Sequence, residues 1–140
     1  MTIAAQFAGT PSYSDFPFKN SGVSTIVSGS PVKVDAANAI SASNVAAGVG
    51  VVAAAADCDV CVGFALESAA AGTVLRVRCC GPIAVSKADG AVTAGTFVMA
   101  SATAGKVKTQ AAGSASVGVA LTTAADGEEL LVLVGAAQNA

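Results

Sequence analysis

The four cysteines are the residues whose types and spacing best suit metal or redox chemistry. Cys58 and Cys61 have the two-residue spacing of half a zinc site. Cys79 and Cys80 are adjacent, and neighbouring residues of a strand point to opposite faces, so they are a poor second half. We predict no metal site and buried thiols. The alternative is a disulfide from Cys61 to Cys79 or Cys80, which a predicted hairpin turn between them would bring close.

The sequence offers little for catalysis. It contains no histidine, which removes the Ser/His/Asp and Cys/His schemes and the commonest general base. Most carboxylates fall in predicted turns, where Asp caps the backbone, although Glu67 with a second carboxylate is a remaining alternative. The glycines do not follow the spacing of a phosphate-binding loop. We therefore predict no enzyme, no catalytic residues, no cofactor and no small-molecule substrate.

Charge and hydropathy exclude further classes. Seven Lys and Arg residues against nine Asp and Glu give a net charge of −2, which is no footprint for nucleic acid. The longest apolar run, residues 45–56, is interrupted by glycine and too short to span a membrane. No secretory leader is recognisable, so we expect synthesis in a cytoplasm. Only 11% of residues are charged, and a surface with few charges is poorly protected against association. This indicates a protein that is part of a larger assembly or, equally, a biased genome composition.

Two similar segments, residues 62–77 and 117–132, organise the chain. Nine of their paired positions are identical, including Gly63 with Gly118 and Gly72 with Gly127. In each, short apolar runs flank a small-residue turn that ends in glycine, which predicts a β-hairpin. We extend the repeat to about residues 31–80 and 82–135 by matching Pro31–Val34 with Pro82–Val85. Frequent turns predict an all-β fold: a compact β-barrel or β-sandwich built from two related hairpin units.

Residues 1–22 differ from the rest and predict an extended N-terminal arm, which precedes a single β domain at residues 23–140. Two prolines in the arm disfavour helix. The arm holds four of the six aromatic residues. Aromatic side chains are favoured anchors at interfaces, so we expect the arm to dock on a neighbouring chain; the alternative is that it folds back on its own core. These four residues are Phe7, Tyr13, Phe16 and Phe18.

The second half resembles the small capsid cement, or head decoration, proteins of tailed bacteriophages. The resemblance covers roughly residues 59–135. It rests on a strand after Gly81, an Ala-Gly turn before an apolar strand, a Val-Gly strand, an acidic Gly turn and a final apolar strand. The corresponding residues are Gly81–Val85, Val92–Met99, Gly105–Val107, Val117–Leu121, Ala124–Glu128 and Leu130–Leu133.

This resemblance implies a structural virion protein on the outer surface of the capsid, made in the host cytoplasm. Its implied partners are the major capsid protein and further copies of itself, as a homotrimer. Partner-binding residues would be the four arm aromatics, with Arg76 and Arg78 at an inter-subunit contact. A β-repeat domain of a surface-layer or adhesin protein is the alternative, and the lack of a recognisable leader argues against it.

Overall fold

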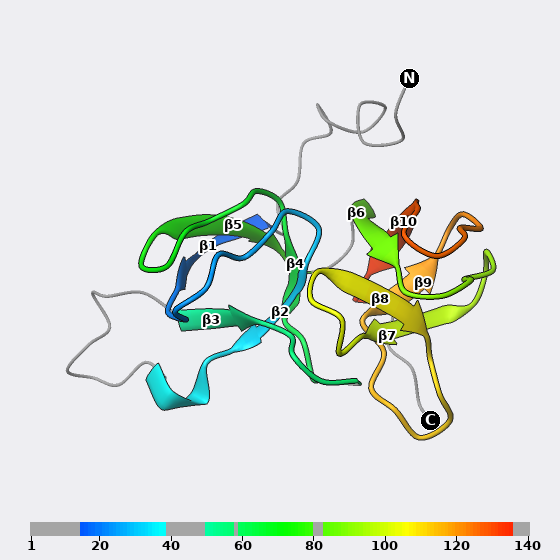
Figure 1. Cartoon of the computed structure of the whole chain (residues 1–140), viewed down its shortest axis with the longest axis horizontal. Helices are drawn as coiled ribbons and strands as arrows, with labels where there is room; N and C mark the ends of the chain where they lie inside the picture. Colours follow the sequence, from blue (N-terminus) through cyan, green and yellow to red (C-terminus); the bar gives the residue numbers. More distant parts are fainter. Residues whose placement is uncertain (1–14, 39–49, 58, 80–82, 136–140) are drawn as a thin grey trace.

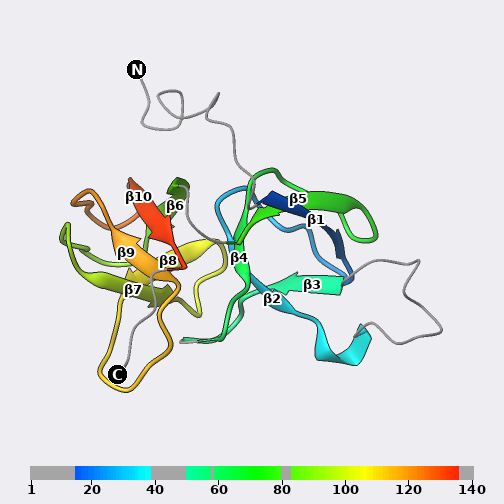
Figure 2. The ribbon, with the colours of Figure 1, turned by 180° about the vertical axis from the view of Figure 1, so that it is seen from behind.

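Two five-stranded closed β-barrels form the fold and lie side by side (Figures 1 and 2). The computed structural model describes residues 15–38, 50–57, 59–79 and 83–135. Within these ranges the only helical element is a single 3₁₀ turn, η1 (Ala36–Asn38). The predicted all-β fold built from two related units is therefore confirmed.

The strands follow the chain in order, five to each barrel. The first barrel has the strand order β1-β3-β2-β4-β5, and the second has β6-β8-β7-β9-β10. The first barrel consists of β1 (Asp15–Asn20), β2 (Pro31–Val34), β3 (Gly50–Ala53), β4 (Gly63–Ala65) and β5 (Val74–Arg78). The second consists of β6 (Ile83–Ala88), β7 (Phe97–Ala100), β8 (Lys106–Thr109), β9 (Gly118–Ala120) and β10 (Glu129–Val134).

The two barrels share one topology. In each, the first strand pairs parallel with the third, and the other pairings are antiparallel. The isolated bridge between Ile26 and Ala69 also has its counterpart between Val92 and Ala124. Strands β1 to β5 therefore correspond to β6 to β10, one by one.

The structure agrees with the predicted hairpins and differs from the sequence analysis around them. Residues 62–77 and 117–132 contain β4–β5 and β9–β10. Pro31–Val34, however, corresponds to β7 rather than to the strand near Pro82, because alternating residues fit any strand and only pairing sets the register. Asp15–Asn20, predicted to belong to the arm, is β1 and pairs with β3 and β5. Residues 23–140 accordingly hold only part of the first barrel.

Each barrel encloses a core of small aliphatic side chains. In the first barrel these residues are Ile26, Val32, Val51, Ala65, Ala69, Leu75 and Val77. In the second barrel they include Ala84, Ala88, Val92, Val98, Ala100, Val107, Val117, Ala120, Ala124, Leu130, Val132 and Val134. Inward residues alternate with outward residues along each strand, as expected for closed barrels.

Glycine at the first position of β4 and of β9 is required by the closeness of the next strand. A Cβ atom added at Gly63 would lie 2.1 Å from the carbonyl oxygen of Arg78. At Gly118 it would lie 2.3 Å from the carbonyl oxygen of Leu133. Both contacts are with backbone, which cannot rotate away. This close approach explains why glycine occurs at both equivalent positions of the two hairpins.

We predict that Gly63→Ala lowers the free energy of unfolding by at least about 3 kcal/mol, because the added carbon forces β4 away from β5. Urea denaturation followed by circular dichroism measures this change. Gly113→Ala is the matched control, since its φ of 80° is strained but no atom lies within 4 Å of the added carbon. The control should lose only about 1–2 kcal/mol. Equal losses in the two variants would contradict the steric explanation.

Candidate functional site

The contact between the two barrels centres on Phe64 in β4. Successive residues of a strand point to opposite faces, so Ala65 enters the core of the first barrel and Phe64 points outward. The Phe64 side chain is nevertheless fully buried, within the apolar cluster of the second barrel. Ala54 of the first barrel joins the same cluster. The second barrel thus covers the outer face of β4.

Two hydrogen bonds to backbone carbonyls align the barrels around this apolar contact. The Ser86 hydroxyl of β6 donates to the carbonyl oxygen of Gly29 at 2.8 Å and is buried. Arg78 of β5 donates from Nη1 to the carbonyl oxygen of Ile83 at 2.6 Å. A Cβ atom at Gly29 would lie 2.8 Å from the carbonyl oxygen of Val85, so a side chain there would separate the barrels.

The two arginines that the sequence predicted to bind a partner lie in different surroundings. Arg78 forms a two-pronged ion pair with Asp15 of β1, at 2.9 and 3.0 Å, and its side chain is only 11% exposed. Arg76 is 64% exposed, and its Nε lies 3.7 Å from Glu67. Both arginines point outward, but only Arg78 reaches the second barrel. Arg78 therefore holds the fold together, and Arg76 remains available at the surface.

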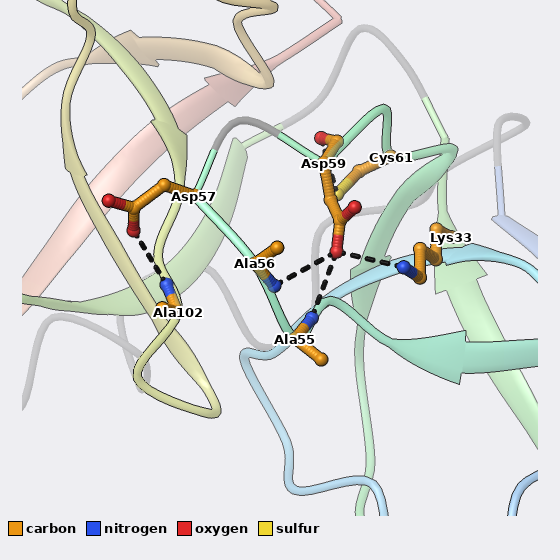
Figure 3. Close-up of polar contacts among 7 residues, drawn as sticks. All are labelled: Lys33, Ala55, Ala56, Asp57, Asp59, Cys61 and Ala102. Carbon is orange, nitrogen blue, oxygen red and sulfur yellow. Dashed lines mark hydrogen bonds and ion pairs between the residues drawn. The ribbon is translucent and has the colours of Figure 1, made fainter.

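The connection from β3 to β4, residues 54–62, carries two carboxylates with different roles (Figure 3). Asp59 accepts hydrogen bonds from the backbone amides of Ala55 and Ala56 and from Lys33 Nζ, at 3.0, 3.1 and 2.9 Å. Burial raises the pKa of Asp59, but the Lys33 ammonium and the two amides outweigh it, and the pKa lies below its ordinary value. Asp59 thus fixes the shape of its own loop.

Asp57 reaches from this connection to the second barrel. Its carboxylate accepts a hydrogen bond from the backbone amide of Ala102 at 2.8 Å and pairs with Lys108 of β8 (Figure 3 shows the amide contact). The hydrogen bond from Lys108, and then that from Ala102, hold the pKa of Asp57 below its ordinary value. Asp57 therefore ties β8 and the turn before it to the first barrel by an ion pair and a hydrogen bond.

Within the described part of the chain, the cysteines do not form the disulfide that the sequence offered as an alternative. Cys61 and Cys79 are not bonded to each other, while Cys58 and Cys80 lie outside the described residues. Burial, followed by the nearby Asp59 carboxylate, raises the pKa of the Cys61 thiol to about 12. Among the residues described, no group of three or more Cys, Asp or Glu side chains could hold a metal ion.

The structure describes two of the four aromatic residues that were predicted to belong to the arm. Phe7 and Tyr13 lie outside the described residues. Phe18 packs against the core of the first barrel, while Phe16, also in β1, is 50% exposed.

In the described ranges, no helix has the length and apolar character to cross a membrane.

Sequence reasoning missed the residues that join the barrels: Phe64, Asp57 and Ser86. One signal was present for Phe64. It is a large aromatic residue in a repeat of small residues, and the second hairpin has the smaller Val119 at the equivalent position. Such a difference indicates that another part of the protein packs against Phe64. The partners themselves could not be found, since they lie far apart in the chain.

Two adjoining barrels joined by an outward aromatic residue and a few polar bonds define a double-barrel all-β protein. The phage cement protein family matches residues 39–136, which is more than half of the chain. The chain therefore belongs to the phage cement protein family. This agrees with the resemblance noted in its sequence.

A solved structure with the same fold is the head fiber gp8.5 N base in bacteriophage phi29. The two share 12% sequence identity with a TM-score of 0.66, over 90% of this chain and 98% of that one. At this identity the likeness shows the shared fold. No match was found among curated protein sequences.

We predict that Phe64→Ala lowers the free energy of unfolding by about 3–5 kcal/mol, because it removes a buried ring between the barrels. Urea unfolding measures the loss. Val60→Ala, at a position that is 77% exposed, is the control and should stay within about 0.5 kcal/mol of the wild type. A Phe64→Ala loss as small as the control's would show that the ring does not join the barrels.

We also predict a pH dependence of the Asp57 contact. Because folding lowers the pKa of Asp57, its contact stabilises the fold at pH values above about 3.9, the unfolded value, and is lost as the pH falls through the folded pKa. The NMR shift of the Ala102 amide should titrate with a midpoint below the pKa of an unfolded aspartate. Asp57→Asn should abolish this titration, and Asp126→Asn, a carboxylate paired with Lys106, should leave it. Persistence in Asp57→Asn would refute the assignment.

Proposed function

We propose that this protein is a capsid decoration protein, which binds the outer surface of the assembled phage head and stabilises contacts between major capsid subunits. The single observation that carries the proposal is the family match over residues 39–136. The fold shared with a phage head fiber base supports it. This role needs no reactive centre, and we propose no catalytic activity. The family match favours this function over a surface-layer or adhesin domain.

Decoration stabilises a shell by linkage. A protein that binds the assembled lattice but not separate subunits shifts the equilibrium toward the lattice. If it binds as a homotrimer, three weak contacts act together, and the second and third form at a high effective concentration. The protein would be made in the host cytoplasm and then added to the virion.

The structure suggests how the predicted partner-binding residues share this task. Phe7 and Tyr13 precede β1 and are proposed to anchor on a neighbouring subunit. Phe16 adds a half-exposed ring at the start of β1, and Arg76 adds an exposed charge. Arg78 supports the arm indirectly, because its ion pair with Asp15 fixes the residue from which the arm departs.

We predict that deleting residues 1–14 weakens binding to heads by about tenfold or more without unfolding the barrels, since β1 begins at Asp15. Purified heads lacking the protein are sedimented with the wild type or the variant, and the temperature at which they release DNA is recorded. The wild type should co-sediment and raise this temperature.

Phe7→Ala/Tyr13→Ala in the full-length chain tests whether the aromatic rings, rather than the length of the arm, are responsible. It should reproduce most of the deletion's effect. Unchanged binding in both variants would remove the arm from the mechanism. Failure of the wild type to bind any head would overturn the proposed function itself.

A further inference from the structure

The turn between β4 and β5 and the turn between β9 and β10 occupy equivalent positions in the two barrels. Gly72 in the first turn and Gly127 in the second have φ values of 80° and 79°. Their backbone N–H groups donate to the carbonyl oxygens of Asn20 and Ala88, the last residues of β1 and β6, at 2.7 and 2.9 Å. The residues around the two glycines can therefore be compared one by one.

The two turns differ in charge, although both are exposed to solvent. Three acidic residues of the second turn correspond to uncharged residues in the first. The pairs are Asp126 with Ala71, Glu128 with Thr73, and Glu129 with Val74. The Val74 side chain is 67% exposed. Charged turns keep a protein soluble, so an uncharged turn with an exposed aliphatic residue indicates a surface that a partner covers.

The loop after β1 adds a second aliphatic residue to this end of the first barrel. Five residues separate Asn20 from Ile26, whereas three separate the equivalent Ala88 from Val92. The longer loop presents Val23, whose side chain is 96% exposed. The insertion therefore enlarges the uncharged surface that the turn between β4 and β5 begins.

Asn20 fixes this longer loop against the barrel. Its side chain is fully buried, and its Nδ2 donates to the carbonyl oxygens of Ser24 and Ala69, both at 2.9 Å. Its Oδ1 accepts from the backbone amide of Gly22 at 3.1 Å. A buried amide needs such partners, and here the loop supplies two of the three. The loop therefore presents Val23 in a fixed position before any partner binds.

Both features lie at the end of the first barrel that faces away from the second barrel. In Figures 1 and 2 the turn between β4 and β5 and the end of β1 lie on the side of the first barrel opposite to β6–β10. We call this surface the free end. It consists of Val23, Ser24, Ala70, Ala71, Thr73 and Val74.

Two charged residues border the free end and differ in their surroundings. Asp35 accepts hydrogen bonds from the Ser21 hydroxyl and the Ala37 amide, at 2.6 and 3.1 Å. Lys19 pairs across the sheet with Val74, whereas the equivalent lysine of the second barrel pairs with a glutamate. An acidic group on a partner would therefore complement Lys19.

We propose that the free end binds an apolar patch on a major capsid subunit, with an acidic group of that subunit facing Lys19. The inference rests on the proposed function and names the surface through which it acts. Because Asn20 already holds the loop, binding costs little further conformational freedom. A strongly charged patch does not fit, since its charges would lose water without gaining a partner.

The first test gives the first barrel the acids that its own fold carries in the second. Ala71→Asp/Val74→Glu should weaken binding to purified heads lacking the protein by about tenfold or more, because carboxylates would enter an apolar contact. Val60→Glu/Ala111→Asp is the matched control, with the same added charges at exposed positions outside the free end. It should bind as the wild type does. Circular dichroism checks each fold, and equal binding by both variants would overturn the proposal.

The second test concerns the inserted loop. Val23→Ser should weaken binding to heads by about threefold or more, because it removes an aliphatic side chain from the contact. Val27→Ser is the matched control, at a 57% exposed position outside the free end, and should bind as the wild type does. If the two variants bind equally well, the loop makes no contact and the proposal is wrong.

Hydrogen exchange of the wild type locates the contact without any substitution. The amides of residues 23–24 and 70–71 should exchange more slowly on heads than in the free protein. Those of the equivalent turn, residues 125–128, should exchange at the same rate in both. Slower exchange at residues 125–128 alone, or no change in either turn, would contradict the proposed surface.

The same measurements keep this proposal apart from the proposed function. A wild type that binds no heads would overturn decoration itself. If the wild type and Ala71→Asp/Val74→Glu bind heads equally, decoration stands and the free end is not its surface. Sedimentation velocity without heads compares the oligomeric states of the two. A variant that dissociates there would show that the free end contacts another copy of the chain, and the proposal would fail.

Discussion

Burial of the outward side of Phe64 is the interaction on which the arrangement of the two barrels depends. A strand of a closed barrel can bury only one face in its own interior, and the other face meets water unless something covers it. When the second barrel covers a phenylalanine on that outer face, burial of the ring stabilises the contact by about 1.5–3 kcal/mol. The hydrogen bonds of Ser86 and Arg78 then select one orientation among those that would bury the ring.

This contact matters more because the barrels have thin cores. Six alanines line the cluster of the second barrel, one of them Ala54 from the first barrel, and Phe64 is the single aromatic ring that the described residues contribute to it. Small side chains bury little area, so a ring supplied by the neighbouring barrel adds a large share of the apolar contact. Gly63 and Gly118 also keep the barrels narrow, since they let paired strands approach more closely than alanine would allow.

One topology used twice, with different outer residues, gives the two barrels different surroundings. Where the first barrel carries Phe64, Arg78 and Asp15, the second carries Val119, Leu133 and Ile83. The strand pairing is the same, so the difference lies only in side chains that point away from the interior. The same fold can therefore carry different residues on the outer faces of its two barrels, and in the first barrel these residues make the contact with the second.

The sequence by itself determined the all-β class, the two hairpins at residues 62–77 and 117–132, and the family, because alternation and glycine turns are local properties. It did not determine that Asp15–Asn20 belongs to a barrel, since a short strand with an internal proline is identified only by its partners β3 and β5. Nor did it separate Arg76 from Arg78, which share one face of one strand. Tertiary structure decided both, because burial and ion pairing depend on which distant segments meet.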